Sequence, residues 1–427
     1  MVAIVAGSAG GQLLALAAAP LLSRIYGPAD FGVLAVVAAL ATTIGTVAAF
    51  RFDLAIPLPE RERDAQALVA LGLAATGVTA VGGTVGVLAV GDEIARLFGQ
   101  PELELWLWVV SPAAAAMGVV LVLNQLAIRH RRYGSIGRRN FFQSLVSVVT
   151  QLTAGVTGLR PGGMVLGFGV GPVAAALVLL RDAGLRGAEA RAGRDRRHLR
   201  DMARRYCRFP FLLAPSGLLN ILGTQLPVLL IAYWYGSSVA GWLGLTQRVI
   251  AMPAALVATA VAQVYLAEIS RAAREHPRHS RLIFVLASRK LTLFAGFSAL
   301  ALAVAAPPLF SVIFGPEWAI SGVYAQALAV YTGVQLVASP LSQTLVVFER
   351  QGLQLAWDVG RVLVVAGTVS AVAMAGASPL VAVWSLSISG SLAYAASWLM
   401  SLQAVTAGSR QAEQVEDTDE RQLSPRS

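Results

Sequence analysis

Long stretches without a single charged residue dominate this sequence and limit the folds that it can adopt. A helix needs about 20 apolar residues to cross the hydrocarbon core of a bilayer. Six stretches of that length precede residue 181, at 1–23, 31–50, 65–91, 105–128, 140–159 and 161–180. Only 13% of the residues are charged, whereas soluble domains carry roughly 25%. We therefore expect an all-α polytopic membrane protein.

The same pattern returns after an arginine-rich gap. Residues 209–247 lack charge, which is long enough for one span, a turn at "YGSS" and a second span that continues past Arg248 to about residue 266. Further spans are predicted at 291–316 and 318–348, and residues 362–409 hold two more, separated by "GASP". The prediction is twelve transmembrane helices, followed by a polar tail at 406–427 that we expect to be disordered.

The basic residues alternate with the spans and predict the orientation of the chain. They gather after the even-numbered spans, with ten arginines from Arg181 to Arg208 after the sixth, and with Arg129, Arg131, Arg132, Arg138 and Arg139 after the fourth. By the positive-inside rule these loops face the cytoplasm, so both termini are expected there. Anionic lipids, and not nucleic acid, then account for the net charge of +10.

An internal repeat divides the predicted spans into two halves. "YGPADFG" at 26–32 aligns with "YGSSVAG" at 235–241, a shift of 209 residues, and "NQLAIRHRRYG" from Asn124 aligns with "SQTLVVFERQG" from Ser342, a shift of 218. We predict six-helix lobes at 1–180 and 209–405, joined by a cytoplasmic linker at 181–208. Because six is even, the repeat is parallel, and parallel repeats around a central cavity are typical of transporters.

Two stretches near the N-terminus resemble a known family. "LLSRIYGPADFGVLAVVAAL" followed by "FRFDLAIPLPERERDAQALVAL" is similar to the start of bacterial polysaccharide flippases, which belong to the multidrug, oligosaccharidyl-lipid and polysaccharide exporter superfamily. "RRNFFQSLVSVVTQLTAGVTG" fits the same pattern. The resemblance implies a flippase that moves an undecaprenyl-pyrophosphate-linked oligosaccharide from the cytoplasmic to the periplasmic leaflet by alternating access, for surface polysaccharide biosynthesis. Polysaccharide polymerase and glycosyltransferase machinery would be its partners.

Arginine is the side chain best suited to a pyrophosphate, since its planar fork binds phosphate oxygens bidentately and stays charged. Arg248 lies inside a predicted span, where a charge normally faces a cavity. Arg24 and Arg51 stand at the ends of the first and second spans. The resemblance implies that such arginines line a cationic cavity. The alternatives are a structural partner for Arg248 and snorkelling to the interface for the other two.

Two acids and several amides complete the candidate site. Asp53 and Asp358 are candidates for coupling to protons or sodium ions, and the alternative is a boundary ion pair with Arg51 and Arg361. Amides can bind sugar hydroxyls and aromatic rings can stack on sugars, or they can join helices and mark the interface. The residues expected to line a sugar cavity are Asn124, Gln125, Asn220, Gln225, Gln247 and Trp234.

Several activities lack their sequence signals. No phosphate-binding loop ends in Gly-Lys-Ser/Thr, and the four histidines lack metal-ligand spacing, so we expect no ATP hydrolysis, metal or cofactor. A drug/cation antiporter of the same superfamily is the main alternative, and we would expect it to have an acidic cavity. An enzyme of glycan assembly is a further alternative, but it would need a large external loop. We therefore expect a transporter and not an enzyme.

Overall fold

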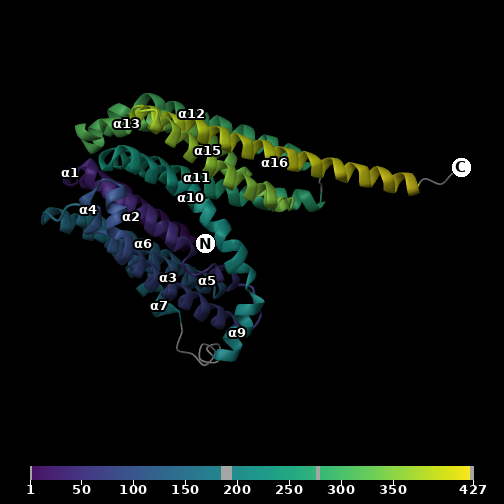
Figure 1. Ribbon diagram of the computed structural model, residues 1–427. Coiled ribbons are helices and arrows are strands. Elements are labelled where there is room, and N and C mark those ends of the chain that lie inside the picture. Colours follow the sequence, from purple (N-terminus) through teal and green to yellow (C-terminus); the bar gives the residue numbers. More distant parts are fainter. Residues whose placement is uncertain (1, 184–194, 276–278, 424–427) are drawn as a thin grey trace. The chain divides into compact units, whose positions relative to one another are not determined.

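The computed structural model describes residues 2–183, 195–275 and 279–423 (Figure 1). In these ranges the chain forms helices and no strands. The helices before residue 210 are α1 (Val2–Ile25), α2 (Pro28–Val47), α3 (Glu62–Leu97), α4 (Pro101–Glu104), α5 (Val110–Arg129), α6 (Tyr133–Val156), α7 (Gly162–Asp182) and α9 (Arg196–Arg205). The later helices are α10 (Ala214–Tyr235), α11 (Ser237–Glu275), α12 (Ser280–Phe314), α13 (Ala319–Leu341), α14 (Gln343–Val347), α15 (Gln351–Met374) and α16 (Pro379–Leu423).

The predicted all-α polytopic class is confirmed. Each of the twelve predicted spans coincides with a helix of 20 residues or more, and nine helical segments of the described ranges are long and apolar enough to cross a membrane. The count of twelve spans stays a prediction. Some helices exceed their charge-free runs: α3 has 36 residues and is about 54 Å long at 1.5 Å per residue. Charged turns outside the hydrocarbon core extend such a helix, and hydropathy does not register them.

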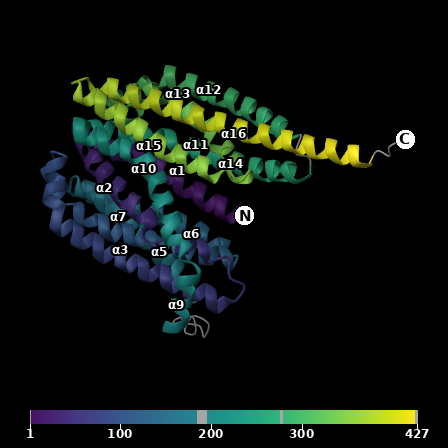
Figure 2. The same ribbon diagram turned by 45° about the vertical axis from the view of Figure 1, so that its right-hand side comes forward.

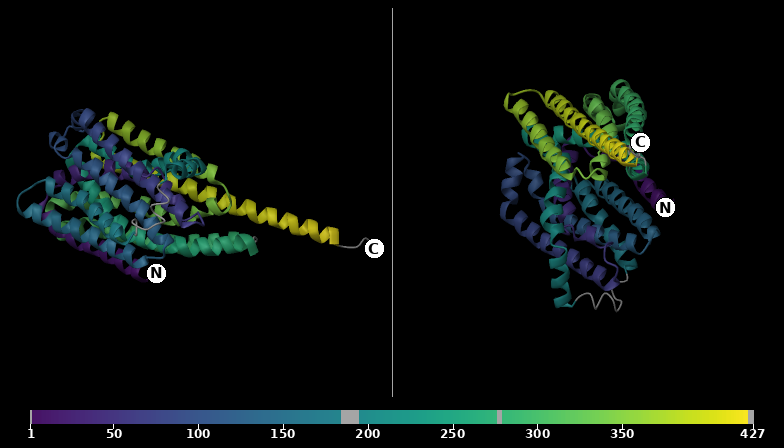
Figure 3. Two further views of the ribbon diagram at one scale, coloured as in Figure 1. Left: turned by 90° about the horizontal axis from the view of Figure 1, so that it is seen from below. Right: turned by 90° about the vertical axis from the view of Figure 1, so that its right-hand side faces the viewer.

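The chain divides into two compact units. The first comprises Met1–Leu245 and Ser311–Trp318, and the second Thr246–Phe310 and Ala319–Ser427. Helix α10 belongs to the first unit because it packs along α2. The lobes predicted at 1–180 and 209–405 describe the sequence repeat, and their boundaries stay a prediction. In the second unit, α16 runs to Leu423 as one rod, through the residues expected to form the tail (Figure 3). Polar composition alone does not distinguish a coil from a polar helix.

A short segment from the second half of the chain belongs to the first unit. The indole nitrogen of Trp318 donates a hydrogen bond of 3.1 Å to the Ser23 carbonyl, and the Ser23 hydroxyl donates one of 3.0 Å to the Phe314 carbonyl. The Trp318 ring also meets the ring of Phe31 edge to face, with centroids 4.7 Å apart. These contacts join residues 311–318 to the end of α1 and the start of α2.

The backbone repeats its turns at a constant shift. Arg131 and Glu349 both adopt left-handed conformations, with φ of 55° and 56°, and Gly158 and Gly376 do so with φ of 84° and 73°. Each pair is separated by 218 residues, because 349 − 131 and 376 − 158 both equal 218. This is the shift found in the sequence. Non-glycine residues seldom adopt a positive φ, so the pairing of Arg131 with Glu349 is a specific sign of a duplicated structure.

The hydrogen bonds of these turns correspond as well. The Arg132 N–H donates to the Ala127 carbonyl at 2.8 Å, and the Arg350 N–H donates to the Leu345 carbonyl at 2.7 Å. The helices that follow, α6 and α15, begin 218 residues apart, at 133 and 351. Helices α6 and α15 are therefore equivalent elements of the two halves.

The repeated "YGPADFG" and "YGSSVAG" turns touch each other reciprocally within the first unit. A Cβ on Gly32 would collide with the carbonyl oxygen of Ser237, and a Cβ on Gly241 would collide with that of Pro28. Under the shift of 209, Gly32 corresponds to Gly241 and Pro28 to Ser237. The contact thus has the self-complementary form of a two-fold interface, and only glycine fits at its two crossing points.

Glycine also brings the helices of the first unit together. Figure 2 shows α5, α6 and α7 side by side, and α6 and α7 share the densest packing. On α7, a Cβ at Gly167 would lie 2.7 Å from the Ser147 carbonyl oxygen, and one at Gly171 would lie 3.1 Å from that of Gln143. The segment "GFGVGP" therefore serves helix packing.

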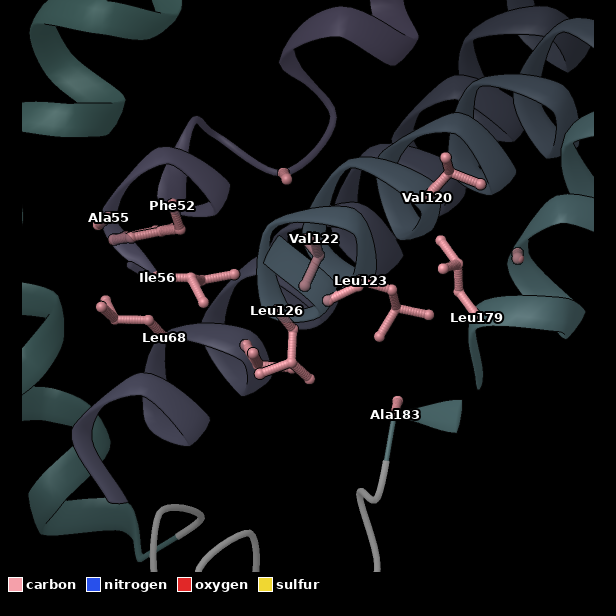
Figure 4. Packing of buried hydrophobic residues seen from close by; sticks show 14 of the residues in the cluster. Phe52, Ala55, Ile56, Leu68, Val120, Val122, Leu123, Leu126, Leu179 and Ala183 are labelled. Atoms are coloured by element: carbon pink, nitrogen blue, oxygen red, sulfur yellow. The ribbon is translucent and has the colours of Figure 1, made fainter. Parts of the chain in front are cut away.

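An apolar cluster fixes the segment that follows α2. Phe52 and Ile56 pack against Leu68 of α3 and Leu126 of α5 (Figure 4), and Ile56, Leu68 and Leu126 are at most 1% exposed. This packing anchors the short 3₁₀ turn η1 (Phe52–Ala55) directly after Arg51.

Candidate functional site

Arg51 is held by a strained turn at the end of α2. Phe50 and Arg51 have φ of 48° and 59°, so two successive non-glycine residues are left-handed. Each such residue costs about 1–2 kcal/mol. The turn persists because Ala49 and Phe52, on either side, are buried in the apolar cluster. The two left-handed residues thus lower the stability of the fold, and they set the direction in which the Arg51 side chain points.

The guanidinium of Arg51 lies against Gly217 of α10. A Cβ on Gly217 would collide with Nη2 of Arg51 and would stand 2.7 Å from its Nε and 2.8 Å from its Cζ, closer than an ordinary contact of 3.4–4 Å. Glycine at this position therefore leaves the space that the guanidinium occupies. The Nε atom is buried and has no hydrogen-bond partner among the described residues. The guanidinium of Arg51 is thus held in a defined place, and at least one of its N–H donors has no acceptor among the described residues.

Asp53 interacts with the charge of Arg51 but does not contact it directly. Its side chain is buried, with 1% exposure, and its Oδ1 has no hydrogen-bond partner in the described part of the chain. No salt bridge joins it to Arg51 among the described residues. The boundary ion pair considered for these two residues is therefore not a direct salt bridge in the described part of the chain. A buried carboxylate oxygen without a donor is costly, and such groups deserve a functional explanation.

Arg24 lies far from Arg51 along the first unit. It is exposed in the last turn of α1, whereas Arg51 follows the opposite end of α2. The 20 residues of α2 span about 30 Å. The structure therefore does not bring Arg24 and Arg51 together, and one pyrophosphate could not contact both.

Arg139 is a cation that the sequence reasoning assigned to a cytoplasmic loop. The structure places it in the second turn of α6, where it lines a pocket of about 230 Å³ together with Gln143. It has no ion pair or hydrogen bond within the described ranges, and its Nε is buried. The charge-free run begins only after Arg139, at Asn140, whereas α6 begins at Tyr133, so Arg139 belongs to a helix and not to a loop. The turn repeated at a shift of 218 residues was the signal that could have located the start of this helix.

The predicted sugar-binding residues of the first unit have mixed surroundings. Asn124 and Gln125 are half-buried on α5, and the Oδ1 of Asn124 is buried without a hydrogen-bond partner among the described residues. On α10, Asn220 is exposed and Gln225 is half-buried. Trp234 is 37% exposed and packs edge to face on Tyr233, with ring centroids 4.8 Å apart. Asn124 thus retains an acceptor for a ligand.

Arg248 and Gln247 belong to the second unit. Both are half-buried in α11. Within the described residues no acidic side chain forms a salt bridge with Arg248. The structural ion pair considered as the alternative role of Arg248 is therefore absent from the described part of the second unit.

Asp358 and Arg361 form a buried cluster between α15 and α16. Their side chains, each 5% exposed, make an ion pair of 3.4 Å. The Arg361 Nη1 donates to the Tyr394 hydroxyl at 2.9 Å, and its guanidinium lies 4.7 Å from the ring centroid of Trp357. Gln335 of α13 also donates to the Tyr394 hydroxyl, at 2.9 Å. The ion pair considered for Asp358 is thus present, and it is enclosed by aromatic side chains.

No metal-binding cluster of histidine, cysteine or acidic residues occurs among the described residues. An apolar pocket of about 350 Å³ lies in the second unit between α12, α13 and α16. Its lining carries no charge, and comprises Thr292, Ala295, Gly296, Ala299, Val330, Gly333, Val334, Val337, Ala338, Ala395 and Trp398. The pocket of the second unit is therefore apolar, whereas the pocket beside Arg139 in the first unit contains a cation and an amide.

The sequence is similar to those of proteins that act in polysaccharide biosynthesis. Residues 21–323 match the family described as "Polysaccharide biosynthesis protein". The chain is 25% identical over 393 residues to the succinoglycan biosynthesis transport protein ExoT of Rhizobium meliloti (strain 1021), which covers 91% of this chain and 74% of that protein.

The fold is similar to those of solved membrane transporters. The inward closed conformation of the lipid II flippase MurJ matches with a TM-score of 0.77 and 12% identity, over 100% of this chain and 94% of that one. An inward-facing multidrug resistance MATE family transporter of the MOP superfamily matches with a TM-score of 0.64 and 14% identity, over 96% and 94%. The chain therefore belongs to the polysaccharide biosynthesis protein family and is a multi-pass membrane transporter with the fold of the MOP superfamily.

Proposed function

We propose that this transporter is a flippase that moves an oligosaccharide linked to undecaprenyl pyrophosphate from the cytoplasmic to the periplasmic leaflet of a bacterial inner membrane. The observation that carries the proposal is the Arg51 site, where a strained turn and Gly217 hold a half-buried guanidinium that forms no salt bridge among the described residues. A cation kept in this way suits a phosphate, because the guanidinium fork binds phosphate oxygens bidentately. The relative named as a succinoglycan transport protein supports the same class of cargo.

The separation of the arginines suggests successive contacts during transport. Arg51 follows the end of α2 that the positive-inside rule places in the cytoplasm, and Arg24 ends α1 at the opposite end. We assign Arg51 to loading and Arg24 to release, with Arg248 as the cation of the second unit. Alternating access would carry the pyrophosphate from one to the next.

The uncharged cavity residues would receive the glycan. We assign hydroxyl recognition to the amides Asn124, Gln125, Asn220, Gln225 and Gln247, with Trp234 as a stacking surface. The polyprenyl tail needs no polar path, and the apolar pocket between α12, α13 and α16 offers it a surface on the second unit. Polymerase and glycosyltransferases would act on the same carrier before and after transport.

Coupling to an ion gradient falls more naturally to Asp53 than to Asp358. Asp53 has a buried oxygen without a hydrogen-bond partner among the described residues, whereas Asp358 is engaged by Arg361. The Asp53 carboxyl group accepts backbone hydrogen bonds from Asp53 and Leu54 but forms no salt bridge among the described residues, so it can gain and lose a proton or sodium ion without breaking one.

A leaflet assay tests the proposed function. In cells that lack the protein, lipid-linked glycan is expected to accumulate where periplasmic glycan-modifying enzymes cannot reach it. Wild-type protein should restore access, Arg51→Lys should restore part of it, and Arg51→Ala should restore little. A drug/cation antiporter would instead change drug resistance and leave the glycan distribution unaltered. A glycan-assembly enzyme would change the structure of the lipid-linked glycan and not its leaflet.

A further inference from the structure

The pocket beside Arg139 has the features of a specific anion site. It lies between α2, α5, α6 and α7, all in the first unit. We infer that Arg139 and Gln143 bind one acidic sugar residue of the cargo through its carboxylate. This inference rests on the proposed function, because it assumes that a glycan passes through the transporter.

The charge of Arg139 has no counterpart in the described part of the protein. No carboxylate pairs with it there, and its Nε is shielded from solvent without a hydrogen bond. Shielding part of a cation from water costs free energy unless an opposite charge or an acceptor compensates for it, so the half-buried Arg139 favours an anionic ligand. The pocket contains one arginine and no other charged side chain, so it matches a singly charged carboxylate better than a doubly charged pyrophosphate.

The repeat supplies an internal comparison. Under the shift of 218, α6 residues Asn140 and Gln143 correspond to Asp358 and Arg361 of α15. In the second half the acid and the arginine satisfy each other at 3.4 Å. In the first half, Asn140 takes the place of the acid Asp358 and Gln143 takes the place of Arg361. The arginine of this helix is at position 139. The first half therefore lacks the carboxylate that the equivalent helix provides, and a ligand can supply it.

The dimensions and lining also fit a single sugar residue. The volume of about 230 Å³ lies below the roughly 300 Å³ at which drug-sized pockets begin. Gln143 follows Arg139 by four residues and shares its helix face, and its amide can donate to and accept from hydroxyls. The remaining lining can pack against the apolar face of a sugar ring, and consists of Gly45, Thr46, Met117, Val120, Leu121 and Pro172.

Thermal unfolding of the purified full-length protein in detergent tests this inference. The probes are millimolar glucuronate, glucose and inorganic pyrophosphate. We expect glucuronate to raise the midpoint more than glucose does. Arg139→Gln should weaken the glucuronate effect at least tenfold in apparent affinity, equivalent to about 1.4 kcal/mol. Arg139→Lys should keep part of it, because the charge remains but the bidentate fork is lost. Arg131→Gln, an exposed arginine outside the pocket, is the matched control and should bind as wild type does.

The possible outcomes separate this inference from the proposed function. If Arg139→Gln binds glucuronate as well as wild type does, or if it loses pyrophosphate binding and keeps glucuronate binding, the carboxylate site is refuted. Unfolding of the free variants shows whether Arg139→Gln is folded, and Arg139→Lys tests the site if it is not. A protein that binds glucuronate through Arg139 yet leaves lipid-linked glycan unmoved in the leaflet assay would contradict the flippase and retain the site.

Discussion

Replacing Gly217 with alanine should displace the guanidinium of Arg51 without destabilising α10, the helix that contains Gly217. The new Cβ would collide with Nη2 of Arg51 and would stand 2.7 Å from its Nε, whereas ordinary contacts begin at 3.4 Å, so the guanidinium must move by more than 3.4 − 2.7 = 0.7 Å. The side chain is flexible and can yield, and alanine in place of a mid-helix glycine contributes about 0.5–1 kcal/mol. The expected result is an unchanged or higher melting temperature together with impaired transport. Displacements near 1 Å at a reacting or binding group can lower rates by about 100-fold.

The leaflet assay and thermal unfolding should be run together on Gly217→Ala, with Gly77→Ala as the control. Gly77 lies in α3, and a Cβ there would meet nothing within 4 Å. We expect at least a tenfold loss of transport in Gly217→Ala and none in Gly77→Ala. Normal transport by a folded Gly217→Ala protein would refute the positioning role of the contact. A melting temperature that falls together with transport would show that Gly217 acts through packing alone.

Two further predictions concern the helix contacts of the fold. Asp358→Asn leaves Arg361 charged and buried, so the free energy of unfolding should fall by about 3–5 kcal/mol, and the double variant Asp358→Leu/Arg361→Met should recover most of the loss. Equal stability of the single variant and wild type in a denaturation series would disprove this. Gly32→Ala and Gly241→Ala place a methyl group on backbone carbonyls that cannot easily yield, so each should cost about 1–3 kcal/mol, as overpacking usually does. Because the contact is reciprocal, a large effect of one with no effect of the other would contradict the two-fold description.

The spans were predictable because charge is expensive in hydrocarbon, and so the charge-free runs follow the helices. The same rule does not mark where a helix begins, and α6 begins before Arg139, which lines a mostly apolar pocket together with Gln143. Sequence spacing predicted the pair of Asp358 and Arg361 correctly, since residues three apart share a helix face. It misled for Arg51 and Asp53, which stand two apart where the left-handed turn ends the helix. The contact with Gly217 could not be foreseen, because it joins segments far apart in the sequence.

The reciprocal contact of Gly32 and Gly241 has a consequence for how this protein can change over evolutionary time. It is the contact that two identical six-helix subunits would make as a symmetric dimer. In such a dimer every substitution appears twice, so a new cation on one helix brings its copy on the other. In a fused chain each half can change separately. The arginine of α15, Arg361, can therefore stay paired with Asp358 while the arginine of α6, Arg139, stays available to a ligand. Fusion thus allows a symmetric framework to carry a single asymmetric recognition site.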